Sequence, residues 1–240
     1  MAQHTTTAFD SDLRELADAI VDMGVRAQKQ IIDAFHALQK GDVELARSVK
    51  AADVAIDALQ HDIEIKAIGT IARRQPLAVD LRDIVGALRI ATDLERIGDL
   101  AANIAKRAEQ LGNEKWPDEI TVALRTMTER VLKQLREVID SYDHRDLTKA
   151  LDVWKSDEEV DALHDSIFRH VLTYMMEDPG NISLGMHLLF CAKNIERIGD
   201  HATNIAETVY YIVTGKQMPP DRPKEDKSHR VSVSAPAPVS

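Results

Sequence analysis

The feature that most constrains the fold of this chain is an internal duplication. Residues 91–105 read ATDLERIGDLAANIA, and residues 192–206, which lie 101 positions later, read AKNIERIGDHATNIA. Ten of these fifteen positions are identical, which chance does not produce. Upstream, DVAIDAL at residues 53–59 matches DEEVDAL at residues 157–163 with an offset of 104. The chain is therefore predicted to contain two copies of one structural unit.

The spacing of the apolar residues predicts that each copy is helical. Apolar residues recur every three or four positions, which is the period of an α-helix. Aromatic residues make up only 4% of the chain, a supply that suits helices better than sheets. Residues 1–215 contain three prolines, Pro76, Pro117 and Pro179, which we expect at helix starts or connections because proline disrupts a helix interior.

These signals predict an all-α fold of two tandem, pseudo-symmetric antiparallel three-helix bundles. The first bundle covers residues 8–112 and the second covers residues 113–215. The predicted helices follow the apolar stripes over 13–38, 45–71 and 77–111 in the first copy, and cover 118–144, 146–177 and 181–215 in the second. Five prolines follow Gln217, so residues 216–240 are predicted to form a disordered tail.

Composition excludes several classes of protein. The 40 acidic residues outnumber the 30 Lys and Arg and give a net charge of -10, which disfavours nucleic acid as a partner. We find neither a membrane-spanning apolar run nor a secretory signal, so a cytoplasmic protein is expected. The single cysteine, Cys191, cannot form an internal disulfide and is predicted to lie in the core.

Rows of oxygen-bearing side chains lie beside the predicted core stripe in both copies. One acidic pair four residues apart would be a solvated helix face. Here both copies keep the like charges, together with Gly98 and Gly199 in mid-helix, where glycine costs about 1 kcal/mol relative to alanine. A cation between the rows would offset the repulsion. The rows are Asp53, Asp57 and His61 with Glu95, Asp99 and Asn103, and Asp157, Asp161 and Asp165 with Glu196, Asp200 and Asn204.

The pattern therefore predicts oxygen-rich metal sites that could take Mg, Mn, Fe or Zn, with room for more than one ion each. Arg96 and Arg197 lie inside the motif, where they could bind an anion. We favour the interpretation that they neutralise neighbouring carboxylates.

Other candidates carry weaker signals. His61, His164 and His201 are either further ligands or surface histidines, and the second interpretation is favoured. Trp116 and Trp154 are predicted to be packing anchors.

The body of the chain, from about residue 10 to 215, resembles the PhoU family of bacterial phosphate-transport accessory and regulatory proteins. The resemblance rests on the paired ERIGD motifs, the NIA that follows each, the paired D-x-x-x-D on the preceding helices, and RRQPLAVDLR at residues 73–82. The second copy lacks the P-x-x-x-D-L-R element, so any role of Asp80 and Arg82 belongs to the first bundle. The tail has no counterpart in the family.

The resemblance implies two similar three-helix bundles side by side that hold multinuclear metal clusters. It also implies negative regulation of the phosphate-starvation response through the cytoplasmic ATPase side of a phosphate ABC transporter and through its sensor histidine kinase. The protein would be a homodimer or higher homo-oligomer, peripheral to the membrane only through these partners. The implied ligands are Asp53, Asp57, Glu95 and Asp99 for the first cluster and Asp157, Asp161, Glu196 and Asp200 for the second.

Our interpretation is a regulator that is not an enzyme, because no nucleophile, general base or cofactor loop accompanies the acidic rows. The alternatives are a metal-storing or di-metal helical bundle unrelated to phosphate, and a purely structural helical adaptor. A ferritin-like di-metal oxidase needs E-x-x-H on two helices, and this chain contains none. The sequence leaves open the identity and number of the metal ions, the oligomeric state and whether phosphate is bound directly.

Overall fold

The computed structural model describes residues 2–219, with side chains from Phe9 onward, and all regular structure in this part of the chain is helical. The all-α prediction is therefore confirmed. The greater part of the predicted tail, residues 220–240, lies outside the described residues. The elements are α1 (Ala2–Lys40), α2 (Val43–Arg74), α3 (Val79–Leu111), α4 (Asp118–His144), α5 (Leu147–Lys155), α6 (Asp157–Glu177), the 3₁₀ helix η1 (Pro179–Asn181) and α7 (Ile182–Thr214).

Local chemistry sets the helix boundaries. After α1 ends, Asp42 caps α2 by accepting a hydrogen bond from the backbone N–H of Leu45 at 2.9 Å. At the end of α3, Gly112 adopts φ 54° and donates its N–H to the carbonyl of Ala108, a conformation that glycine takes at little cost. Pro117 immediately precedes α4, as expected for a residue that cannot supply an interior hydrogen bond.

One predicted helix is divided in the structure. The single helix predicted over residues 146–177 is two helices, α5 and α6, which meet at Ser156. The Ser156 hydroxyl donates to the carbonyl of Val153 at 2.8 Å and accepts from Nε2 of the buried Gln134 at 3.0 Å. A serine hydroxyl that bonds to nearby backbone competes with the regular helix, which accounts for a break at this position.

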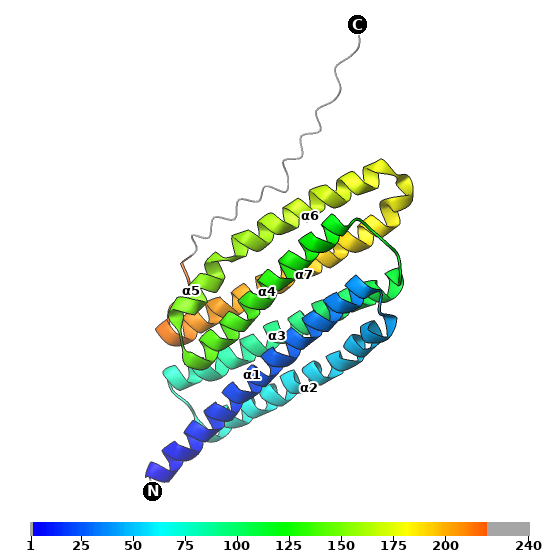
Figure 1. Ribbon diagram of the computed structural model, residues 1–240. Coiled ribbons are helices and arrows are strands. Elements are labelled where there is room, and N and C mark those ends of the chain that lie inside the picture. Colours follow the sequence, from blue (N-terminus) through cyan, green and yellow to red (C-terminus); the bar gives the residue numbers. More distant parts are fainter. Residues whose placement is uncertain (1, 220–240) are drawn as a thin grey trace.

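The helices form two groups that lie side by side. In Figure 1, α1, α2 and α3 pack together, and α4, α5, α6 and α7 form the adjacent group, in which α5 and α6 together take the place of α2. The groups meet chiefly where α3 packs along α7, and α1 also contacts α4.

Helices α3 and α7 run antiparallel where they meet. Near the start of α3, the guanidinium of Arg89 lies over the ring of Tyr211, which is near the end of α7, at 5.4 Å. Towards the end of α3, Arg107 lies over Phe190 in the first half of α7 at 4.7 Å. These pairs fix the direction of one helix relative to the other, and equivalent helices of the two copies thus form the centre of the molecule.

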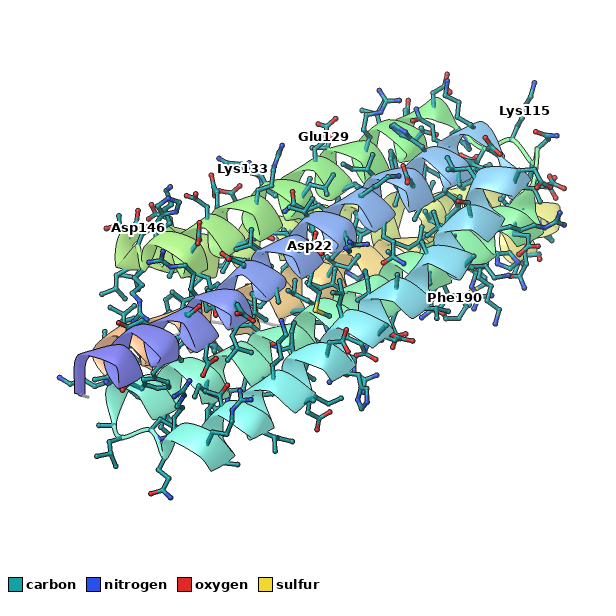
Figure 2. All side chains as sticks on the ribbon, turned by 90° about the horizontal axis from the view of Figure 1, so that it is seen from below. Asp22, Lys115, Glu129, Lys133, Asp146 and Phe190 are labelled. Atoms are coloured by element: carbon teal, nitrogen blue, oxygen red, sulfur yellow. The ribbon has the colours of Figure 1, made fainter. Side chains whose placement is uncertain are left out.

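The predicted core stripes are buried in both copies. The residues concerned are at most 1% exposed: Leu94, Ile97, Ala101 and Ile104 in α3, and Ile195, Ile198, Ala202 and Ile205 in α7. Polar side chains such as Asp22 on α1 and Glu129 and Lys133 on α4 cover the outer surface (Figure 2). Within residues 2–219, we find no helix with an apolar stretch of the length that a bilayer crossing needs.

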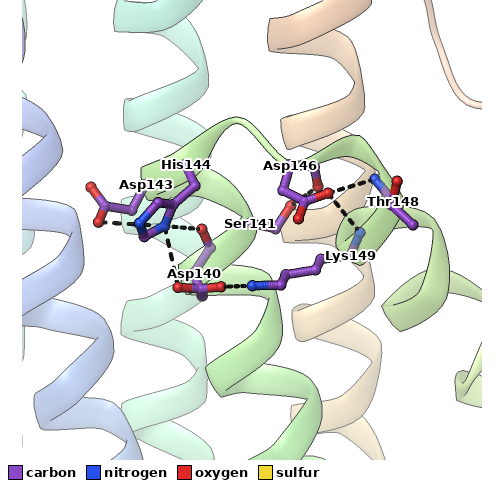
Figure 3. A network of polar contacts seen from close by, with 7 residues as sticks. All are labelled: Asp140, Ser141, Asp143, His144, Asp146, Thr148 and Lys149. Carbon is purple, nitrogen blue, oxygen red and sulfur yellow. Dashed lines mark hydrogen bonds and ion pairs between the residues drawn. The ribbon is translucent and has the colours of Figure 1, made fainter.

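A polar network closes the turn between α4 and α5 (Figure 3). Asp146 caps α5 by accepting from the N–H groups of Thr148 and Lys149 at 2.9 and 3.2 Å. Its carbonyl accepts from the hydroxyl of Ser141 at 2.7 Å, and the ammonium of Lys149 pairs with Asp140. Asp146 lies 104 residues after Asp42, so the duplicated units use the same capping residue.

Candidate functional site

The structure brings the four predicted carboxylates of the first copy together. Asp53 and Asp57 lie on α2, and Glu95 and Asp99 lie on the facing part of α3. Burial raises the pKa of Asp53, and the charges of Asp57 and Asp99 raise it further, against a hydrogen bond from Gln30 that lowers it. The four carboxylates therefore lie near enough, on the facing sides of α2 and α3, for their charges to act on Asp53 and Glu95.

The neighbouring carboxylates on α2 and α3 also act on Glu95. Burial is the main cause that raises its pKa, followed by the charges of Asp99, Asp57 and Asp53, while Arg96 acts in the other direction. The neighbouring carboxylates thus make Asp53 and Glu95 harder to ionise. A bound cation would reverse this effect, because it stabilises the charged form of every carboxylate around it.

Arg96 neutralises part of the row, as predicted. Its Nε lies 3.4 Å from Oε2 of Glu95, and its Nη1 lies 3.3 Å from Oδ2 of Asp99. Its side chain is half exposed, so these contacts are weak and easily exchanged.

The second copy places its carboxylates on α6 and α7. Asp157 is 1% exposed and accepts a hydrogen bond from the hydroxyl of Thr203 on α7 at 3.3 Å. Glu196 pairs with the ammonium of Lys193 at 2.6 Å. Asp161 and Asp200 are partly buried on the same two helices. This row therefore has polar partners that differ from those of the first row.

The three candidate histidines take separate positions. His61 is exposed beside Glu64, 4.0 Å away, and His164 lies 3.8 Å from the neighbouring Asp165. His201 contacts Oδ1 of Asp93 at 2.9 Å and so links α7 to α3.

Two further predictions from the sequence are confirmed. Cys191 is fully buried, and Trp116 and Trp154 pack against the core. Trp154 also donates from its indole nitrogen to Glu207 at 3.3 Å.

The donor set fits a hard or borderline cation, since the converging ligands are carboxylate oxygens with water access. As the side chains are oriented, no three His, Cys, Asp or Glu residues in the described part of the chain are close enough together to hold one ion. Coordination would require the carboxylates to turn towards a common point.

Sequence reasoning missed two glutamines behind these rows. Gln30 on α1 and Gln134 on α4 are 4% and 1% exposed, and they occupy equivalent positions at the offset of 104. Gln30 donates to Asp53, whereas Gln134 donates to Ser156, immediately before Asp157. The signal was the retention of the same polar residue on the buried face of both helices.

Comparison with known proteins decides the family. The family model described as the PhoU domain matches this chain twice, over residues 20–108 and 124–209. The chain belongs to the PhoU family. Both matched segments of this PhoU-family chain contain one complete set of four carboxylates.

Relatives and solved structures agree with this membership. The chain is 50% identical to the phosphate-specific transport system accessory protein PhoU homolog of Rhizobium meliloti, over 93% of this chain and 94% of that protein. It is 46% identical to the homolog of the same name in Caulobacter vibrioides, over 94% and 98%. The crystal structure of PhoU from Pseudomonas aeruginosa superposes with a TM-score of 0.83 at 38% identity, over 87% of this chain and all of that one.

Proposed function

We propose that this PhoU-family protein is a metal-binding regulator of phosphate uptake that acts by binding partners and not by catalysis. It would repress the phosphate-starvation response through contacts with the cytoplasmic ATPase side of the phosphate ABC transporter and with the sensor histidine kinase. The observation that carries the proposal is 50% identity, over almost the whole chain, to a phosphate-specific transport accessory protein.

The acidic rows supply the metal-binding part of the proposal. Asp53, Asp57, Glu95 and Asp99 would hold the first group of ions, and Asp157, Asp161, Glu196 and Asp200 would hold the second. Burial and mutual repulsion raise the pKa of Asp53 and Glu95, a cost that a cation would offset. The bound ions, of Fe, Zn, Mn or Mg, would join α2 to α3 and α6 to α7 and so stiffen both outer faces of the molecule.

The surface of the molecule suits protein partners. Long helices offer extended faces of the area that a specific interface needs, and the acidic balance suits a protein partner better than a nucleic acid. We place the protein in the cytoplasm as a homodimer or higher homo-oligomer, attached to the membrane through its partners.

A genetic experiment tests the regulatory role. Deletion of the gene should leave phosphate-starvation genes switched on in phosphate-replete medium, and expression of residues 1–215 should restore repression. Purified protein should also retain the ATPase subunit of the transporter in a pull-down. Normal repression in the deletion strain, with no binding to either membrane partner, would contradict the proposal and favour a metal-storing or structural bundle.

Metal removal tests the metal sites separately. Elemental analysis of the chain purified without added metal should find bound ions, and chelation should lower the melting temperature, because an ion that binds only the folded state stabilises it. The double variant Asp99→Asn with Asp200→Asn should lose metal while its helicity is retained. Unchanged metal content in this variant would show that the ligands have been assigned wrongly.

A further inference from the structure

A buried glutamine lies behind the acidic row of each copy, and the packing of the core does not require one there. Burial of a neutral amide costs free energy unless its hydrogen bonds are made. Gln30 and Gln134 are 4% and 1% exposed, and in both the side-chain oxygen Oε1 is buried without a hydrogen-bond partner. A leucine would satisfy the core better, so the retention of glutamine in both copies calls for a role outside packing.

The contacts of Gln30 show what that role is. Its Nε2 donates to Oδ1 of Asp53 at 3.2 Å and to the backbone carbonyl of Val49 at 3.4 Å. Val49 and Asp53 are one turn apart on α2, so the amide connects α1 to both. A hydrogen bond to one carboxylate oxygen fixes the plane of the carboxylate and leaves lone pairs for a metal ion.

Gly98 makes this contact possible. A Cβ atom at residue 98 would lie 3.0 Å from Oδ1 of Asp53 and 3.1 Å from Oε1 of Gln30. These distances are tighter than nine in ten Cβ contacts, so the amide and the carboxylate would have to move by a few tenths of an ångström. The mid-helix glycine of the ERIGD motif therefore serves the positioning of Asp53.

The second copy uses the same residues differently. Gln134 donates to the hydroxyl of Ser156, and Asp157 accepts from Thr203. A Cβ atom at Gly199 would lie 3.4 Å from Oε1 of Gln134, which is ordinary contact distance. The two glycines are identical in sequence context but not in the space around them.

We infer that Gln30 is a positioning residue of the first metal site, which orients Asp53 through the space that Gly98 leaves, and that the second site does not depend on its glutamine and glycine in this direct way. The inference rests on the proposed metal-binding function. It assigns a role to Gln30, which lies outside the acidic motifs. It also means that the two sites position their carboxylates differently.

The test measures Mn²⁺ binding to the full-length chain by electron paramagnetic resonance after chelation and dialysis. Asp200→Asn disables the second site, so that the signal reports the first. In this background Gln30→Met, which keeps the volume of the side chain but has no donor, should weaken Mn²⁺ binding about 10- to 100-fold, the range typical of lost outer-shell partners. Gln134→Met is the matched control, measured in a background in which Asp99→Asn disables the first site instead, and it should leave the affinity of the second site unchanged.

A second pair of variants covers the possibility that Gln30→Met fails to fold. Gly98→Ala should weaken Mn²⁺ binding in the Asp200→Asn background, whereas Gly199→Ala should not weaken it in the Asp99→Asn background. Melting temperatures of the metal-free proteins separate positioning from stability, because a purely structural role would lower the melting temperature and leave the Mn²⁺ affinity of the folded chain intact. A lower melting temperature with unchanged Mn²⁺ affinity in Gln30→Met and Gly98→Ala would overturn this inference and leave the proposed metal sites intact. Absence of Mn²⁺ binding by the chain without substitutions would overturn it together with the proposed metal sites.

Discussion

At the scale of single residues, the same residue type at equivalent positions of the two copies does not guarantee the same surroundings. Gly98 and Gly199 both belong to ERIGD, yet only Gly98 is enclosed by a carboxylate and an amide at close range. The difference arises from residues outside the motif: in the second copy Ser156 accepts the hydrogen bond of Gln134, and Thr203 donates to Asp157. Contacts of this kind depend on how neighbouring helices pack.

Cys191 provides a residue-scale prediction. It is fully buried, and burial raises the pKa of its thiol to about 12. Because the thiolate is the reactive form, the folded protein should not react with a thiol reagent at pH 8, whereas the unfolded protein should react at once. A colorimetric thiol assay with and without denaturant measures this. Rapid labelling without denaturant would mean that the centre of α7 opens to solvent.

Much of the candidate site could be predicted from sequence at this scale, but its supporting residues could not. The eight carboxylates stand out because each pair is four residues apart, on one face of its helix, and because the duplication repeats the pairs. Gln30 is also repeated, as Gln134, but a single polar residue on an apolar face has several explanations until its partner is known. The contact with Asp53 joins residues 23 positions apart on different helices, which periodicity does not reveal.

At the scale of helices, the boundaries that the sequence predicted correctly are those set by glycine, proline and capping aspartate. The break between α5 and α6 was missed because serine is tolerated in helix interiors. It disrupts the helix here only in combination with the packing of Gln134 against its hydroxyl.

The turn between α4 and α5 gives a prediction about pH. A hydrogen bond from Lys149 lowers the pKa of Asp140, and the same contact raises the pKa of Lys149. A carboxyl with a lowered pKa contributes stability above its unfolded pKa of about 4 and loses it as the pH falls through the folded value. Lys149→Met should therefore lower the melting temperature at pH 7, and the difference from the parent should shrink below about pH 4.

A matched control separates the contact from the general effect of charge. Lys115→Met removes the same charge from the connection between α3 and α4 and should change the melting temperature less at pH 7. Circular dichroism melts of the three proteins across pH 2–8 make the comparison. A Lys149→Met difference that stays constant down to pH 2 would show that its pairing with Asp140 does not affect stability.

At the scale of the whole molecule, the centre is the contact between α3 and α7. The sequence predicted two similar bundles, but it could not show which helices join them, because the apolar stripes that face inward within a bundle resemble those that face the other bundle. The structure resolves this through pairs such as Arg89 with Tyr211 and Asp93 with His201.

Gly86 tests how tightly this contact is packed. A Cβ atom there would lie 2.4 Å from Cδ1 of Ile212 on α7, whereas Gly69 on α2 has no heavy atom within 4 Å of the corresponding position. Gly69→Ala should stabilise the fold by about 0.5–1 kcal/mol through helix propensity. Gly86→Ala should destabilise it, because overpacking costs about 1–3 kcal/mol.

Denaturant unfolding of both variants supplies the measurement. Adding Ile212→Ala should make Gly86→Ala less costly than it is alone, since the space is then available. Equal stabilisation by the two alanines would indicate that the bundles are not tightly packed at this point.

The antiparallel packing of α3 against α7 also bears on the origin of the chain. Two copies of one unit that meet through the same helix, in opposite directions, have the geometry of a closed two-fold assembly. An ancestor with a single three-helix unit could have formed this pair from two separate polypeptides, and gene fusion would then have joined them through the α3–α4 connection. Once the copies were covalently linked, each could change alone, which accounts for an amide contact to Asp53 on one side and an amide contact to Ser156 on the other.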